Sequence, residues 1–264
     1  MASHFSASTR PDSSTLNKRQ LMRRAVLETL ERRELLAADS AGVVFAPGTA
    51  ADYVDDVIGS YLQGAHANGE SGNANAPGPR WNNPTGGVSP NEGDPSVVSW
   101  SIVPDGTIDT ANNSQTNLIA FMDNIYGGGT GPVENRPWFN IFERAYDRWS
   151  EVSGLTFVYE SADDGAPMGG TNRGVTGVRG DVRIGGRPID GNFGVLAFNY
   201  FPNNGGNAGF DGDMIIDTND VFYFNSADGP NGENRALSNV LMHEAGHGIG
   251  LGHTIPVNQT KLME

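Results

Sequence analysis

The stretch from His243 to His253 reads H-E-x-x-H-x-x-G-x-x-H, and it constrains this chain more than any other feature. Two histidines four residues apart on a helix lie on one face, one turn apart, so His243 and His247 can reach a single metal ion. Gly250 lets the backbone leave helical geometry, and the turn that follows returns His253 as a third ligand. Three neutral imidazoles leave one tetrahedral position open, which is the arrangement of a catalytic Zn²⁺ rather than a structural one.

Glu244 follows the first histidine, where a carboxylate can act as general base on a zinc-bound water. Five residues of the pattern are fixed, so a chance match in a chain of this length is on the order of 1 in 100,000. The flanks predict a helix with one apolar face, because apolar or small residues recur at helical spacing: Leu237, Val240, Leu241, Ala245, Gly248 and Ile249. We therefore expect a buried helix with a catalytic zinc site; the alternative is a histidine cluster with no chemical role.

The same motif resembles that of the metzincin metallopeptidases and, within them, the matrixins. In that family a methionine in a tight turn follows the third histidine and lies beneath the metal; Met263, ten residues after His253, matches it. The chain ends one residue later, so we expect a domain truncated after the Met-turn. The resemblance implies a zinc endopeptidase that acts on protein or peptide substrates and is secreted or held at the cell surface.

The resemblance also implies an α/β fold of the α+β kind, a metzincin-like zincin domain in which a twisted mixed sheet of about five strands carries a backing helix and an active-site helix. Sequence periodicity agrees with this fold. Strand patterns occur at 97–103, 155–159 and 180–184, and an amphipathic helix is predicted from Pro137 to Val152. The apolar face of that helix should be core without any cofactor role: Phe139, Phe142, Ala145, Tyr146 and Trp149.

Residues 194–202 resemble the matrixin edge strand, which accepts the substrate by antiparallel strand addition. Leu196 and Ala197 match the positions whose backbone faces the scissile bond. In the family, histidines that bind a second, structural zinc occupy the positions of Phe198 and Ile215. Both residues are apolar here, so we expect no structural zinc.

Aspartates gather between Asp211 and Asp220, in turns that offer several oxygen donors to a hard cation such as Ca²⁺. By resemblance, four residues fall near the calcium ligands of matrixins: Asp181, Asp213, Asp217 and Asp220. The alternative is that Asp, Asn and Gly are simply turn formers. The sequence therefore predicts a candidate structural calcium site beside the catalytic zinc.

Three regions are expected along the chain: a basic, targeting-like segment at 1–38, a poorly ordered linker rich in Gly, Asn and Pro at 39–94, and the metallopeptidase domain at 95–264. Residues 30–37 fit L-E-x-R-x-L-L-A and resemble a segment near the N-terminus of many planctomycete surface and secreted proteins. The alternative for the first region is a basic amphipathic helix that docks on a membrane or a protein.

Charge and composition limit the classes of molecule that this chain is expected to bind. The net charge is −14, and residues 1–36 hold seven Lys/Arg against four Asp/Glu, so the remainder carries −17. Such an acidic body repels nucleic acid and attracts divalent cations, although solubility explains the acidity equally well. The chain has no cysteine, so a cysteine-to-zinc latency switch is excluded. No stretch approaches the roughly 18 apolar residues of a membrane span, and the sequence specifies no oligomeric state.

A rival function belongs to a different class. The chain could be a non-catalytic, metal-binding surface or adhesion module derived from a metallopeptidase, because it ends before the family's specificity pocket is complete. The intact Glu244 argues against this reading, since a module without turnover has no need of a general base.

Overall fold

A computed structural model describes these residues: 38–39, 43–45, 80–81, 84–85, 94–202, 208–224 and 235–252. All of them belong to one compact unit, Leu36–Glu264. The second unit, Met1–Leu35, holds most of the predicted basic segment and lies outside the described residues.

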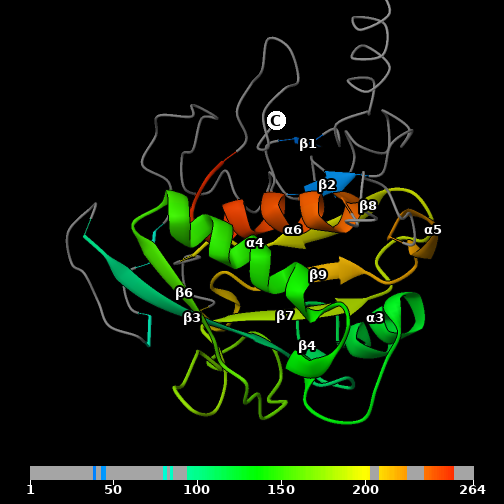
Figure 1. The fold of residues 1–264 in the computed structure, drawn as a ribbon, viewed down its shortest axis with the longest axis horizontal. Helices are drawn as coiled ribbons and strands as arrows, with labels where there is room; N and C mark the ends of the chain where they lie inside the picture. The colour runs from blue at the N-terminus through cyan, green and yellow to red at the C-terminus, as the bar shows by residue number, and fades with distance from the viewer. Residues whose placement is uncertain are drawn as a thin grey trace, which may run out of the picture. The chain divides into compact units, whose positions relative to one another are not determined.

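A mixed sheet forms the centre of the domain, with strand order β1-β2-β8-β9-β7-β3-β6 (Figure 1). Its strands are β1 (Ala38–Asp39), β2 (Val43–Phe45), β3 (Ser96–Ile102), β6 (Leu155–Tyr159), β7 (Val182–Arg187), β8 (Val195–Asn199) and β9 (Met214–Asp217). Strand β3 runs parallel to β6 and β7, and β7 runs parallel to β9, whereas β8 is antiparallel to β9. The predicted mixed sheet of about five strands is confirmed by β8, β9, β7, β3 and β6, and the two short strands β1 and β2 extend it beyond β8.

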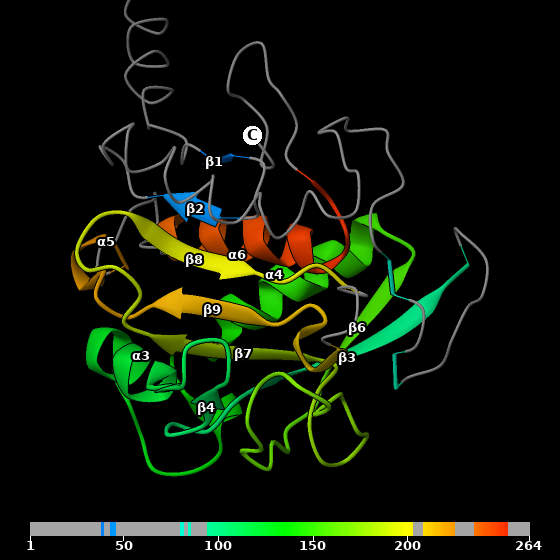
Figure 2. The same ribbon diagram turned by 180° about the vertical axis from the view of Figure 1, so that it is seen from behind.

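Two long helices lie side by side on one face of this sheet, as both views show (Figure 1 and Figure 2). They are α4 (Phe139–Val152) and α6 (Arg235–Gly248). The smaller elements are α3 (Leu118–Tyr126), α5 (Val221–Phe224), the 3₁₀ turns η2 (Val133–Asn135) and η3 (Ala208–Phe210), and the two-stranded sheet of β4 (Ile108–Asp109) and β5 (Ser114–Gln115). The predicted helices and strands are confirmed with shifts of a few residues, whereas α3 and β9 were not predicted.

Aromatic side chains join α4 to the sheet. Trp100 on β3 stacks on Phe139 and on Tyr146, with ring centroids 5.6 Å and 4.8 Å apart. Tyr146 also packs on Phe157 of β6 at 5.0 Å. Each such pair adds about 0.5–1.5 kcal/mol to the burial of its rings. The prediction that the aromatic face of α4 is core is therefore confirmed.

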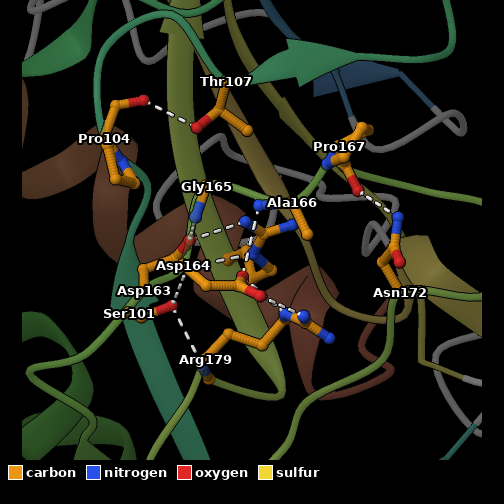
Figure 3. A network of polar contacts seen from close by, with 12 residues as sticks. Ser101, Pro104, Thr107, Asp163, Asp164, Gly165, Ala166, Pro167, Asn172 and Arg179 are labelled. Atoms are coloured by element: carbon orange, nitrogen blue, oxygen red, sulfur yellow. Dashed lines mark hydrogen bonds and ion pairs between the residues drawn. The ribbon is translucent and has the colours of Figure 1, made fainter.

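A polar network stiffens the long connection from β6 to β7 (Figure 3). Asp163 accepts hydrogen bonds from Ser101 Oγ at 2.7 Å and from Arg183 Nη2 at 2.6 Å, and the Asp163 and Arg183 side chains are only 3% and 1% exposed. Nearer the surface, the Arg179 guanidinium pairs with Asp164 and holds the pKa of that carboxyl well below its usual range. The connection is thus held by ion pairs rather than by regular secondary structure.

Residues from the segment predicted as linker contact the domain. The Trp81 indole Nε1 donates a hydrogen bond to the Gly248 carbonyl at 2.9 Å. The backbone N–H and the hydroxyl of Thr85 donate to the two carboxylate oxygens of Asp181, each at 2.9 Å. Described contacts of the domain therefore reach back beyond residue 95, the predicted start of the domain.

Candidate active site

Helix α6 carries the histidine motif, and its buried apolar face and two tryptophans fix its position. Its predicted apolar face is confirmed, because Leu237, Val240 and Leu241 are completely buried. The Trp149 indole of α4 donates to the Met242 carbonyl at 2.9 Å, and Trp81 binds the carbonyl of Gly248 at the helix end. These contacts hold α6 along its whole length, so its polar groups have little freedom to move.

The two motif histidines on α6 converge. The Nε2 atoms of His243 and His247 lie 3.0 Å apart, and both residues are buried. Two nitrogens held by a tetrahedral Zn²⁺ at about 2.0–2.1 Å would be roughly 3.3–3.4 Å apart. The observed separation is close to that geometry, so one metal ion can bridge these nitrogens with a small outward movement.

The tautomer of His247 follows from its other nitrogen. Nδ1 lies 2.7 Å from the Leu251 carbonyl oxygen. A carbonyl oxygen can only accept, so Nδ1 carries the proton and Nε2 keeps its lone pair. Such an outer contact orients a metal-binding imidazole and raises its basicity.

The turn after α6 has the geometry that the motif requires. Gly250 has φ of +95°, in the left-handed region that favours glycine. The Gly250 N–H donates to the His247 carbonyl at 2.8 Å, and the Leu251 N–H donates to the Gly246 carbonyl at 3.0 Å, which together form a Schellman motif. Helix α6 therefore ends in a left-handed turn at Gly250, whereas the predicted third ligand His253 and the predicted Met-turn residue Met263 lie outside the described residues.

The Glu244 carboxyl is buried, and no described hydrogen-bond donor offsets the cost of removing it from water. Its side chain is 0% exposed, and among the described residues neither carboxylate oxygen has a hydrogen-bond partner. Burial raises the pKa of Glu244 well above its ordinary value. A buried, unpartnered carboxyl on the turn that holds two converging imidazoles is costly for stability, which points to a functional role.

Two polar groups share this interior: Tyr146, which the sequence predicted as core, and Asp213, which it predicted as a candidate calcium ligand. The Tyr146 hydroxyl and Asp213 Oδ2 are buried, and within the described ranges neither has a hydrogen-bond partner. Burial raises the pKa of Tyr146, and the charges of Asp213 and Glu244 raise it further. No signal in the sequence indicated that Tyr146 would lie near Asp213 and Glu244. Their proximity depends on how α4 packs against α6 and the start of β9.

The predicted substrate strand is β8. Leu196 and Ala197 are completely buried, and Ala197 pairs with Ile216 on the inner side of the strand. Phe198 and Ile215, the positions of the family's structural zinc, lie in an apolar cluster. Its other buried members are Val103, Met168, Val195 and Phe210.

The four aspartates predicted near calcium lie in different surroundings. Asp181 accepts hydrogen bonds from the backbone and hydroxyl groups of both Thr85 and Ser99. Asp213 is 1% exposed, and its Oδ1 accepts from the Arg183 N–H at 2.7 Å. Each of these two carboxylates therefore has hydrogen-bond donors from the protein itself.

Asp217 is the last residue of β9 and Asp220 lies three residues later; both accept hydrogen bonds from the loop before β8. Asp217 accepts from the backbone N–H groups of Ile189 and Asn219, at 3.2 Å and 2.8 Å, and Asp220 accepts from that of Phe193 at 3.0 Å. Burial raises the pKa of Asp217 to about 6, and burial with the charges of Asp217 and Asp190 raises the pKa of Asp220 to about 7. Asp190, which binds the Val195 N–H at 2.9 Å, was missed because its Asp-Gly sequence signals only a turn.

The described ranges contain no group of three or more His, Cys, Asp or Glu side chains that could hold a metal ion. The third histidine of the motif, His253, lies outside these ranges, and the calcium site stays a prediction. In the same ranges no helix is long and apolar enough to cross a membrane.

Comparison with known proteins gives related sequences. The sequence pattern of the family described as Matrixin matches residues 130–263. Matrix metalloproteinase-16 of Homo sapiens is 33% identical over 115 residues, which cover 42% of this chain and 17% of that protein. Metalloendoproteinase 4-MMP of Arabidopsis thaliana is 30% identical over 149 residues, 53% of this chain and 34% of that protein. Interstitial collagenase of Oryctolagus cuniculus is 32% identical over 118 residues, which cover 45% of this chain and 22% of that protein. The matched part of the chain thus spans at most 34% of the length of these relatives.

Proposed function

Because this chain belongs to the matrixin family of metallopeptidases, we propose that it is a zinc-dependent endopeptidase that hydrolyses peptide bonds in protein or peptide substrates. The observation that carries this proposal is the Glu244 carboxylate, which is fully buried, lacks a hydrogen-bond partner among the described residues, and neighbours His243 on α6. A carboxyl buried without a hydrogen-bond partner lowers the stability of the fold, so packing of the core does not explain its presence.

The residues present fit a zinc ion. His243 and His247 offer Nε2 atoms 3.0 Å apart, and the Leu251 carbonyl selects the correct tautomer of His247. His253 is the third ligand by the motif. A bound zinc ion supplies Lewis acidity, which polarises a carbonyl and lowers the pKa of water.

Glu244 is the proposed general base. Its carboxylate accepts a proton from the attacking water and donates it to the nitrogen of the departing amine, as one group acting first as base and then as acid. The rigid backing of α6 by Trp149 and the buried apolar face keeps this carboxylate at a fixed depth. Such proton transfer contributes about 10²–10⁴-fold in rate.

The substrate is proposed to pair antiparallel with the outer edge of β8, where Leu196 and Ala197 supply backbone groups. Main-chain hydrogen bonds then give affinity, and side-chain pockets give selectivity. A location outside the cell is also proposed, because two relatives are named Matrix metalloproteinase-16 and Interstitial collagenase.

Calcium is proposed as a second, structural cation at the end of β9. Asp220 is 0% exposed, and its Oδ2 has no hydrogen-bond partner among the described residues, while Asp217 lies three residues away with a carboxyl of raised pKa. A hard divalent cation would relieve the repulsion between these carboxylates. Asp190 is a further candidate ligand from the loop that both aspartates hold.

Turnover of a quenched fluorogenic peptide and of denatured casein tests the proposal. We expect activity in the zinc-loaded chain, loss with a chelator, and return with added zinc. Glu244→Gln should keep its zinc and lose about 10²–10⁴-fold in kcat. If the zinc-loaded chain cleaves neither substrate, the endopeptidase proposal fails, and the non-catalytic metal-binding module takes its place.

A further inference from the structure

The outer edge of β8, which the proposed function reserves for the substrate, is paired with a segment of the same chain. Strand β2 runs antiparallel to β8, with Val43 opposite Phe198, Val44 opposite Ala197 and Phe45 opposite Val195. The register shifts between Val44 and Phe45. Both views show β2 alongside β8 at this edge of the sheet (Figure 1 and Figure 2).

Strand β2 also lies against α6, the helix that carries Glu244 and the two converging histidines. The segment is therefore next to both components of the proposed substrate cleft, the β8 edge and the motif helix. Its direction, antiparallel to β8, is the direction proposed for a substrate strand.

One strand edge can form a ladder with only one partner at a time, because each backbone N–H and C=O on that edge has a single direction of approach. The pairing of β2 spans β8 from Val195 to Phe198 and so includes Leu196 and Ala197. While β2 is in place, no substrate strand can form the same hydrogen bonds.

We propose that Val43–Phe45 is an internal competitor for the outer edge of β8, which must leave before a peptide substrate can pair there. This inference rests on the proposed endopeptidase function. Such an occupant needs no cysteine, of which this chain has none, because it acts on the strand edge rather than on the metal.

The pairing is short, which suits an occupant that can leave. β2 has three residues, and among the described residues its other edge pairs with the two residues of β1. Pro47 follows closely in the sequence and has no N–H with which to continue a ladder. Residues 41–46, Ala-Gly-Val-Val-Phe-Ala, carry no charge, so the segment that occupies the edge is uncharged and largely apolar.

The test uses the full chain with two matched double variants. Val43→Pro/Val44→Pro removes two backbone donors from the strand, while Val43→Thr/Val44→Thr keeps the donors and the β-branched shape. Amide hydrogen exchange of β8 is measured first, because it does not need peptidase activity. KM and kcat for one fluorogenic peptide are measured on the same samples loaded with zinc.

We expect the proline variant to exchange the outward amides of residues 195–198 about 10-fold faster or more, with no change in those that face β9. Its KM should fall about 5-fold or more at unchanged kcat, because apparent affinity scales with the fraction of chains whose edge is free. The threonine variant should match wild type. A blocked peptide of residues 41–46 should inhibit the proline variant competitively.

Unchanged amide hydrogen exchange of β8, or an unchanged KM, in the proline variant overturns the proposal that Val43–Phe45 competes for the edge. Cleavage of the blocked peptide also overturns it, because a segment that is turned over cannot hold the edge. If no variant cleaves any peptide, yet β8 exchange rises in the proline variant and the labelled hexapeptide binds it, the endopeptidase proposal fails while occupancy of the edge stands.

Discussion

Gly250→Ala tests whether the turn after α6 presents the metal ligands. Gly250 has φ of +95°, and an L-residue in the left-handed region costs roughly 1–2 kcal/mol. For a domain of this size a loss of 1 kcal/mol lowers Tm by about 2–4 °C, so we expect a fall of about 2–8 °C in metal-free protein. The shifted turn also moves the Leu251 carbonyl away from His247 Nδ1, now 2.7 Å distant. Loss of such an outer contact costs about 10–100-fold in metal affinity.

The control for this variant lies two residues away. Gly252→Ala adds the same methyl group where φ is not positive, and no atom of the described residues lies within 4 Å of the added Cβ. Thermal melts of the apo proteins and zinc titrations against a competing chelator give the two readouts. If Gly250→Ala matches Gly252→Ala in both Tm and zinc affinity, the turn does not position the ligands and the reasoning is refuted.

Three further predictions, tested with four variants, address the metals and the core. Metal analysis should find about one zinc per chain, lost in His247→Ala and retained in Glu244→Ala, because Glu244 is base and not ligand; two tightly held zinc ions in wild type would contradict the apolar interpretation of the second site. Millimolar calcium should raise Tm by mass action on the native state, and Asp217→Asn should diminish that gain; a melting curve that ignores calcium leaves the aspartate as a turn residue. Asp163→Ala should lower the free energy of unfolding in urea by about 3–5 kcal/mol, since it strands the buried guanidinium of Arg183. A loss below about 1 kcal/mol would mean that water replaces the carboxylate.

The metal-binding half of the site could be predicted because it is local. His243 and His247 share a helix face by virtue of their spacing, and the left-handed turn at Gly250 is a property of glycine itself. The amphipathic helix α4 and the strands β3 and β6 were predicted for the same reason, since their periodicity lies within a few residues.

Other elements could not be predicted, because their partners are far away in sequence. β9 is four residues long, and it is a strand through pairing with β7 and β8 rather than through its own pattern. Helix α3 begins at Leu118, and its first turn is capped from a distance, because the Asp105 carboxylate accepts from the N–H groups of Ile119 and Ala120, whereas Asn117 at the N-cap makes no side-chain hydrogen bond to the helix. Trp81 lies in a stretch whose composition indicates a linker, yet its indole binds Gly248, 167 residues away.

The sequence by itself determined the pattern on which the proposed chemistry rests: two histidines on one helix face, a glutamate beside the first of them and a glycine turn, all within eleven consecutive residues. Only the tertiary structure decided the surroundings of that chemistry. It buried Glu244 without a partner, brought Tyr146 and Asp213 into the same interior, and paired Val43–Phe45 with the β8 edge. The physical reason is range: side-chain spacing on one helix follows from backbone geometry, whereas burial and strand pairing depend on which distant segments come together.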